Sequence, residues 1–378
     1  MLGPRSGRAP SAAGPAINSA ILRRSSFGLI AGAVLAPASA LALAACGGSS
    51  PASTSSSASV AITTPASAAT VRTATASTLV NPPGKPRPHR RPTAYAVGLR
   101  VLRIVDAGRH ITLPDGSTPP RVLITTVRYP ALGTPGGGDR RGAAPAVHDG
   151  PFPLLIFGHG YNVTPAPYTA LQRAWARAGY VVGAPLFPLE NPGAPGGPNE
   201  NDLVNQPGDM SVVISRLIAD AAAPPSWLRG LVNPRAVAVS GQSDGGDTAL
   251  AAAYDSADRD SRIRAAVILS GAEIPGLNGF AFGAGSPPLL ATQGTADTIN
   301  PPDMTTTFYD LAARPKYLLE LLGAQHLPPY TTEQPQLGIV ERVTIAFLDR
   351  YLKHAAAGIA RMRHYGNVPG VATLDANP

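Results

Sequence analysis

The sequence has very little cysteine, with a single residue, Cys46, in 378. One cysteine can form neither an intramolecular disulfide nor a zinc site of several thiolates. Acidic residues are absent from the first 96 positions, which carry nine of the 31 basic residues. The other 22 basic residues stand against all 23 acidic ones, so the chain from Val97 onward has a net charge of about −1. We therefore expect no nucleic acid as a partner of the folded part.

The first 45 residues have the layout of an export signal. Arg23 and Arg24 precede an apolar stretch rich in alanine and leucine, and small residues follow it up to Cys46. Residues 43–46, Leu-Ala-Ala-Cys, resemble the bacterial lipobox, whose cysteine is lipidated and becomes the new N-terminus. The resemblance implies export by the Sec or the twin-arginine route and a lipoprotein anchored through Cys46 to the outer face of the cytoplasmic membrane. An ordinary signal peptide and a single membrane-spanning helix are the alternatives.

Residues 46–96 consist mainly of serine, threonine, alanine, proline and glycine. A segment with so few large apolar side chains cannot bury enough surface to offset the entropy lost on ordering. We therefore expect a disordered tether over 46–96 and one folded domain over 97–378. The length and the 44% hydrophobic content suffice for a single α/β domain.

Strand patterns alternate with helix patterns along this domain. Two strand patterns come first with no helix pattern between them, which predicts an antiparallel start of the sheet. The alternation that follows predicts a mostly parallel sheet with helices on both faces and no large lid domain. The expected strands are 99–105, 121–129, 153–157, 180–184, 236–239, 265–269, 288–292 and 317–322, and the expected helices are 168–178, 209–222, 246–254, 303–313 and 334–354.

Gly241-Gln-Ser-Asp-Gly245 is the only Gly-x-Ser-x-Gly sequence of the chain. It lies between a predicted buried strand and a predicted helix, which is the setting of a nucleophile elbow. There the serine, Ser243, takes a strained backbone conformation and stands above the carboxyl edge of the sheet, near the positive end of the next helix. A glycine-rich turn that only caps a helix is the alternative.

A serine nucleophile needs a base and an acid that orients the base, and on this elbow both partners follow the serine in the sequence. His326 directly follows a predicted strand, whereas His354 and His364 are expected at the surface. Asp297 also follows a predicted strand and is the predicted acid. Asp303, at the start of the next predicted helix, is the alternative acid.

A tetrahedral oxyanion is stabilised by backbone N–H groups. We expect one from Asp244, directly after the nucleophile, and one from Tyr161, in the loop Gly158-His-Gly-Tyr161. His159 in this loop precedes the serine, and we expect it to hold the loop by hydrogen bonds rather than to act as the base.

The segments that contain Asp297 and His326 resemble a known group of enzymes. In residues 288–302, an apolar strand pattern is followed by Asp297, Thr298 and Pro301. In residues 316–330, a Tyr-Leu-Leu-Glu-Leu strand pattern is followed by Gly-Ala-Gln-His326. Together they are similar to the cutinase-like polyester hydrolases and lipases of actinomycetes. Phe-Gly-His-Gly-Tyr161 is similar to that group and to hydrolases like platelet-activating-factor acetylhydrolase and chlorophyllase.

The resemblance covers about residues 99–352 and implies an α/β-hydrolase fold, a serine esterase and no cofactor or metal. It implies Ser243 as the nucleophile, Asp297 as the acid and His326 as the base, with Tyr161 and Asp244 as amide donors. The family usually has histidine and methionine beside the serine, where this chain has Gln242 and Asp244. We expect the Asp244 side chain to point away from the oxyanion or to cap a neighbouring amide.

The sequence thus predicts a lipid-anchored, monomeric serine hydrolase that cleaves carboxylic esters of short-acyl, lipid or polyester type. Two alternatives stay open. One is a lipoprotein with a catalytically silent hydrolase fold that only binds a ligand. The other is a thioesterase, amidase or peptidase with the same three residues.

Overall fold

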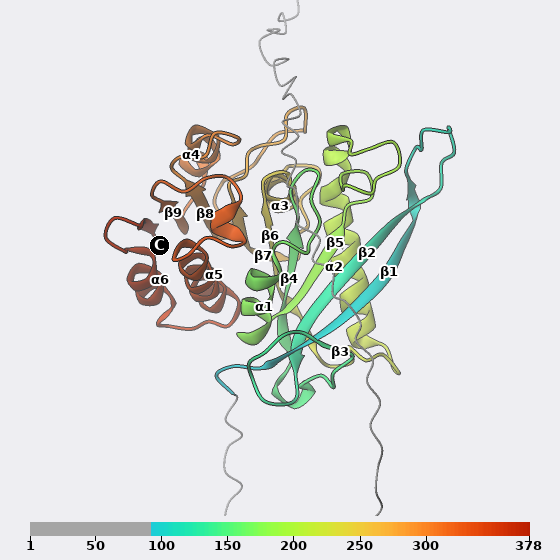
Figure 1. Cartoon of the computed structure of the whole chain (residues 1–378), viewed down its shortest axis with the longest axis horizontal. Coiled ribbons are helices and arrows are strands. Elements are labelled where there is room, and N and C mark those ends of the chain that lie inside the picture. Colours follow the sequence, from blue (N-terminus) through green and yellow to red (C-terminus); the bar gives the residue numbers. More distant parts are fainter. Residues whose placement is uncertain (1–91) are drawn as a thin grey trace, which may run out of the picture. The chain divides into compact units, whose positions relative to one another are not determined.

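A computed structural model describes residues 92–378 of the chain (Figure 1). The predicted export signal, Cys46 and the tether up to residue 91 lie outside the described residues. The folded part includes Tyr95 and Ala96, because both are buried and Ala96 begins the first strand. The domain thus starts slightly before the predicted boundary at 97.

Within residues 92–378, ten strands form one sheet, and six α-helices pack around it. The strands are β1 (Ala96–His110), β2 (Pro120–Ala131), β3 (Arg140–Arg141), β4 (Phe152–Gly158), β5 (Val181–Leu186), β6 (Val232–Gln242), β7 (Ile263–Leu269), β8 (Leu289–Gly294), β9 (Lys316–Leu321) and β10 (Ala372–Asn377). The helices are α1 (Thr169–Arg177), α2 (Gln206–Ala222), α3 (Asp244–Tyr254), α4 (Pro302–Leu311), α5 (Gln336–Leu352) and α6 (Gly358–Gly366). Three short 3₁₀ helices are η1 (Val147–Asp149), η2 (Glu200–Asn205) and η3 (Pro328–Tyr330).

The strand order across the sheet is β10-β9-β8-β7-β6-β4-β5-β2-β1-β3. The strands from β4 to β9 are parallel, whereas β1 pairs with β2 and β2 with β5 in antiparallel fashion. This confirms the predicted sheet with its antiparallel start. The prediction that a helix over 334–354 is the last element is wrong, because α6 and the antiparallel edge strand β10 follow it.

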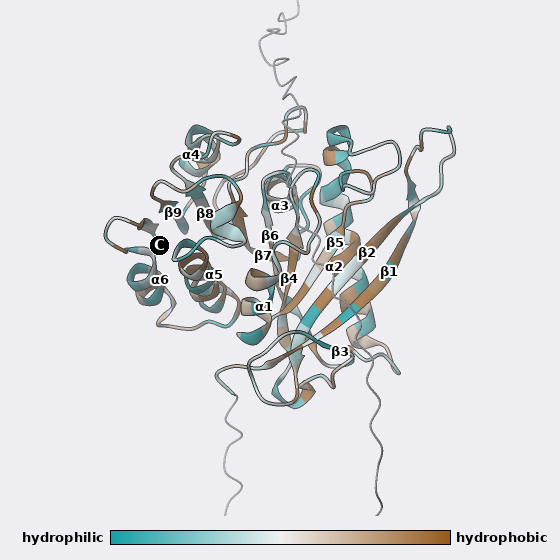
Figure 2. Ribbon diagram, viewed as in Figure 1, coloured by the Kyte–Doolittle hydropathy of each residue, from teal (hydrophilic) through white to brown (hydrophobic). Residues whose placement is uncertain are grey.

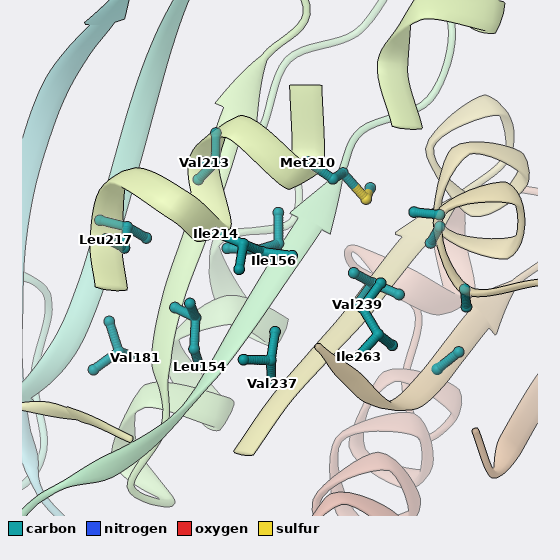
Figure 3. Packing of buried hydrophobic residues seen from close by; sticks show 14 of the residues in the cluster. Leu154, Ile156, Val181, Met210, Val213, Ile214, Leu217, Val237, Val239 and Ile263 are labelled. Carbon is teal, nitrogen blue, oxygen red and sulfur yellow. The ribbon is translucent and has the colours of Figure 1, made fainter. Parts of the chain in front are cut away.

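The core lies on both faces of the sheet, because successive side chains of a strand point to opposite sides. In β4, Leu154 and Ile156 join the cluster that contains the side chains of α2, α3 and α4. The alternate residues Leu155 and Phe157 join the cluster that contains those of α1, α5 and α6. Figure 3 shows the first side, with Ile156 next to Ile214 of α2.

The central strands carry nearly continuous apolar sequences, which are brown in Figure 2. All seven residues of β4 are buried, as are all six of β8. Strands covered by helices on both faces need such runs, because neither face meets water. This is why the short apolar runs of the sequence located these strands well.

The connection between β7 and β8 contains no helix in the described structure, in agreement with the prediction of no large lid domain. One of its side chains, Ile274, packs onto Leu203 of η2 and Ala251 of α3. Within residues 92–378, none of the helices combines the length and the apolar character that crossing a membrane would require.

Candidate active site

Ser243 lies between β6 and α3 in a strained backbone conformation, with φ 56° and ψ −130°. Non-glycine residues rarely adopt these angles, and they persist only where the surroundings enforce them. The Ser243 amide donates to the Leu269 carbonyl oxygen of β7 (3.0 Å), and its own carbonyl accepts from the Asp247 amide (2.9 Å). The predicted turn from strand to helix is therefore present.

The glycines of the motif are required because three backbone segments meet at the elbow. A Cβ on Gly241 would lie 1.9 Å from the Gly245 carbonyl oxygen. A Cβ on Gly245 would lie 2.3 Å from the carbonyl of Gly158, the last residue of β4. No side chain fits at either position without moving main chain.

The structure brings Ser243, His326 and Asp297 together over the carboxyl ends of β6, β8 and β9. His326 Nε2 lies 2.8 Å from Ser243 Oγ, and His326 Nδ1 lies 2.7 Å from Asp297 Oδ2. Each of the three residues is less than 10% exposed. The geometry is that of a serine polarised by an imidazole that a carboxylate orients.

Asp297 is arranged to stay ionised. Burial tends to raise its pKa, but the hydrogen bond and charge of His326 lower it, as do the amides of Ile299 and Asn300. Those two amides donate to Asp297 Oδ1 at 2.9 and 3.0 Å. The net effect is a pKa below the ordinary value, so Oδ2 accepts the bond from His326 as a carboxylate.

The other candidates lie away from these three residues. His354 and His364 are exposed, the first just after α5 and the second in α6 rather than in a tail. Asp303, the alternative acid, is exposed in the first turn of α4. The distances therefore favour Asp297 and His326.

Gln242 was not predicted to contact the histidine. Its Nε2 donates to the His326 carbonyl oxygen (3.0 Å) and lies 3.2 Å from His326 Nε2. Its Oε1 accepts from the buried Tyr168 hydroxyl (2.7 Å). Gln242 thus packs beside the imidazole where the resembled enzymes have histidine, but sequence alone does not reveal these partners.

The loop after β4 lies against the nucleophile. A Cβ on Gly160 would be 3.0 Å from Ser243 Cβ, which brings the neighbouring Tyr161 close to the serine. His159 holds this loop as predicted: its Nδ1 donates to the Gly160 carbonyl (2.9 Å), and its Nε2 accepts from the Phe187 amide (3.0 Å). The neutral imidazole, which has one N–H donor and one acceptor nitrogen, satisfies both hydrogen bonds. Burial lowers the pKa of His159 to about 4.

The Asp244 side chain is buried and lies within hydrogen-bonding reach of the carboxyl group of Glu190. Glu190 is fully buried, and Gln206 Nε2 donates to its Oε2. The sequence prediction that Asp244 points away or caps an amide did not include this partner. The sequence gives little indication that these two side chains meet, because Glu190 lies 54 positions from Asp244 in the chain.

Among residues 92–378, no group of three or more histidine, cysteine, aspartate or glutamate side chains is placed to hold a metal ion.

No protein-family model matches the chain, and no curated protein matches it. Among solved structures, a ferulic acid esterase from Streptomyces cinnamoneus is similar, with a TM-score of 0.54 and 21% sequence identity. The match covers 69% of this chain and 91% of that chain. The chain has the α/β-hydrolase fold. At this identity the likeness concerns the fold alone.

The α/β-hydrolase fold explains why residues distant in sequence meet at Ser243. Its parallel strands end at one edge, and the loops after β4, β6, β8 and β9 therefore converge there.

From the close contact of the main chains at the elbow, we expect Gly245→Ala to destabilise the protein strongly. The new Cβ would collide with the backbone of Gly158, so we expect a loss of about 3 kcal/mol in the free energy of unfolding. Gly138→Ala is the control, because its Cβ would meet nothing within 4 Å. Urea denaturation followed by circular dichroism measures both, and equal midpoints for the two variants would contradict the packing described.

The lowered pKa of His159 makes the free energy of unfolding depend on pH. Its folded pKa of about 4 lies below the ordinary value of 6.5, so as the pH falls from 6.5 to 4 the unfolded chain binds a proton that the folded chain does not. The free energy of unfolding should decrease over this window, by up to about 3 kcal/mol from this group. His159→Gln should flatten the curve, whereas His354→Gln, at an exposed position, should not. Parallel curves for wild type and His159→Gln would refute the assignment.

Proposed function

We propose that the chain is a serine hydrolase that cleaves carboxylic esters through an acyl-enzyme. The observation that carries the proposal is the hydrogen-bonded series from Ser243 Oγ through His326 to Asp297, with both distances below 3 Å. This series lies on a strained elbow that exists only because two glycines allow it. A turn that merely caps a helix requires neither the strain nor the two partners.

In the proposed reaction, Ser243 Oγ attacks the ester carbonyl carbon while His326 Nε2 takes the hydroxyl proton. His326 then gives this proton to the leaving alcohol oxygen as the carbon–oxygen bond breaks, which leaves an acyl-enzyme. Water attacks the acyl carbon next and passes its proton to His326. The bond between Ser243 Oγ and the acyl carbon then breaks, His326 returns the proton to Oγ, and the carboxylic acid leaves. Asp297 keeps the imidazole oriented and stabilises its positive charge at each stage.

The backbone amides of Tyr161 and Asp244 are the proposed donors to the oxyanion. Asp244 begins α3, whose first amides point out of the helix and carry its positive end. Gly160 packs against Ser243 and carries the Tyr161 amide to the same region.

Two exposed apolar side chains support an ester with apolar groups as the substrate. Tyr161 is 41% exposed in the loop after β4, and Ile299 is 62% exposed two residues beyond Asp297. With no helix inserted between β7 and β8, we propose a site open to short acyl chains, lipids or a polyester surface. The similar solved structure is of an esterase for ferulic acid, which agrees with ester chemistry on this fold.

We further propose that the protein is exported and anchored through a lipidated Cys46. The support is the lipobox-like sequence at 43–46 that contains the only cysteine of the chain. The tether between Cys46 and the folded domain would then hold the esterase at a distance from the membrane surface.

The reaction predicts that Ser243→Ala and Asp297→Asn both lose most esterase activity. We expect kcat to fall by about 10⁴-fold or more in each, since the members of such a triad act as a unit. Esters of graded acyl length provide the assay, with Asp303→Asn as the control for a carboxylate outside the site. A fluorophosphonate that labels wild type and Ser243→Ala equally would refute the nucleophile. Turnover of thioesters or anilides in preference to esters would favour the alternative substrate classes.

The anchor predicts incorporation of a labelled fatty acid by the wild-type protein in a bacterial host. Cys46→Ser should abolish the labelling and release the protein from the membrane fraction, because no other thiol is available. Ser49→Ala, in the same segment, is the control and should remain labelled. Labelling that persists in Cys46→Ser would contradict the anchor.

A further inference from the structure

Two buried carboxyl groups lie close together, one of them on the residue that follows the nucleophile. Glu190 follows β5, and Asp244 is the first residue of α3. The Glu190 side chain is 0% exposed and Asp244 is 6% exposed. The charge of Asp244 acts on Glu190, and the two carboxyl groups are close enough for a hydrogen bond between them. Because a carboxylate only accepts hydrogen bonds, such a bond requires a proton on one of the two.

The neighbours of Glu190 favour its protonated form. Gln206 Nε2 donates to Oε2, and Gln206 Oε1, in the same side-chain amide, accepts from the Thr248 hydroxyl at 2.8 Å. No N–H or hydroxyl group of the described residues donates to Glu190 Oε1, which is also buried. An ionised carboxylate at full burial would need more donors than this one amide. Burial and the charge of Asp244 raise the pKa of Glu190 to about 10.

The charged groups around the pair do not compensate a second negative charge. From η2, Asp202 faces Glu190, and its own charge is taken up by a 2.5 Å ion pair with Arg121. From the loop after β4, Tyr161 faces both carboxyl groups, and its pKa is raised by burial and by the charge of Glu200 in η2, with smaller contributions from Glu190 and Asp244. Neither Asp202 nor the neutral phenol of Tyr161 would stabilise a second negative charge on the pair.

Glu190 also contacts the second segment of the proposed oxyanion hole. Its carbonyl oxygen accepts from the amide of Asn162, the residue after Tyr161, at 3.0 Å. The same segment after β5 holds the loop a second time, through the bond from the Phe187 amide to His159. Glu190 therefore joins the loop of Tyr161 by its main chain and the start of α3 by its side chain.

We propose that Glu190 is a positioning residue of the oxyanion hole, which shares one proton with Asp244 and thereby joins the two segments that supply the amides. This inference rests on the proposed function. The shared proton turns the Asp244 carboxyl towards Glu190 and keeps the charge of the pair at −1 rather than −2. A second charge there would oppose the negative charge that develops on the substrate oxygen.

The test compares Glu190→Gln, Glu190→Ala and, as matched control, Glu341→Gln in α5, where burial also raises the pKa of a glutamate. We expect Glu190→Ala to lower kcat by about tenfold or more with little change in KM, because an oxyanion hole acts in the transition state. Glu190→Gln can still donate to Asp244 and accept from Gln206, so it should recover most of this loss. A wild-type kcat in Glu190→Ala, or no recovery in Glu190→Gln, would overturn the proposal.

The dependence of kcat on pH distinguishes a positioning role of Glu190 from a purely structural one, which would not change this dependence. Wild-type kcat should fall reversibly at alkaline pH, with an apparent pKa near 10, as Glu190 loses its proton. The fall should disappear in Glu190→Gln and persist in Glu341→Gln and in Tyr161→Phe, which removes the nearby phenol. A fall unchanged in Glu190→Gln would overturn the shared proton.

An infrared measurement separates this proposal from the proposed function. At pH 8, wild type should show the C=O stretching band of a protonated carboxyl group, and Glu190→Gln should lack it while Glu341→Gln keeps it. The band does not depend on turnover. Its absence in wild type refutes the shared proton, whereas a protein with the band but without activity on any ester refutes the proposed function and the positioning role that rests on it.

Discussion

The backbone of Ser243 is the constraint on which the rest of the site depends. Its angles, φ 56° and ψ −130°, are held by the close contact of β6, the first turn of α3 and the end of β4. That contact is possible only with glycine at 241 and 245, where a Cβ would overlap main-chain atoms. Because β4 is one of these segments, the same contact brings the loop of Tyr161 to the serine.

The site contains two buried acids whose surroundings shift their pKa values in opposite directions. Asp297 has an imidazole and two amides as donors, so its carboxylate form is favoured. Glu190 has one amide donor and an acidic neighbour, so its protonated form is favoured. Such divergence between acids close to one nucleophile is a feature of sites that handle protons. In this account one acid orients the base and the other limits the charge beside the oxyanion.

The sequence predicted the features that depend on local pattern and on chain order. Short apolar runs located the parallel strands because these strands are buried on both faces, and the positions of Asp297 and His326 after strands predicted that they would meet Ser243. The strand β10 was missed because it is an edge strand with exposed polar residues. The helix α6 was missed because it buries only one large apolar side chain, that of Met362, and so has no apolar stripe in its sequence. The contacts of Gln242 and Glu190 could not be predicted either, since each depends on how distant loops pack over the sheet edge.

The most direct test of the account is to trap the covalent intermediate. The protein would be mixed with an excess of p-nitrophenyl acetate, quenched in acid during turnover and digested for mass spectrometry. The proposed acyl-enzyme mechanism predicts a rapid release of about one p-nitrophenol per enzyme and one acetyl group on the peptide that contains Ser243. Turnover without a burst and without acetyl on this peptide, or acetyl on another residue, would contradict it.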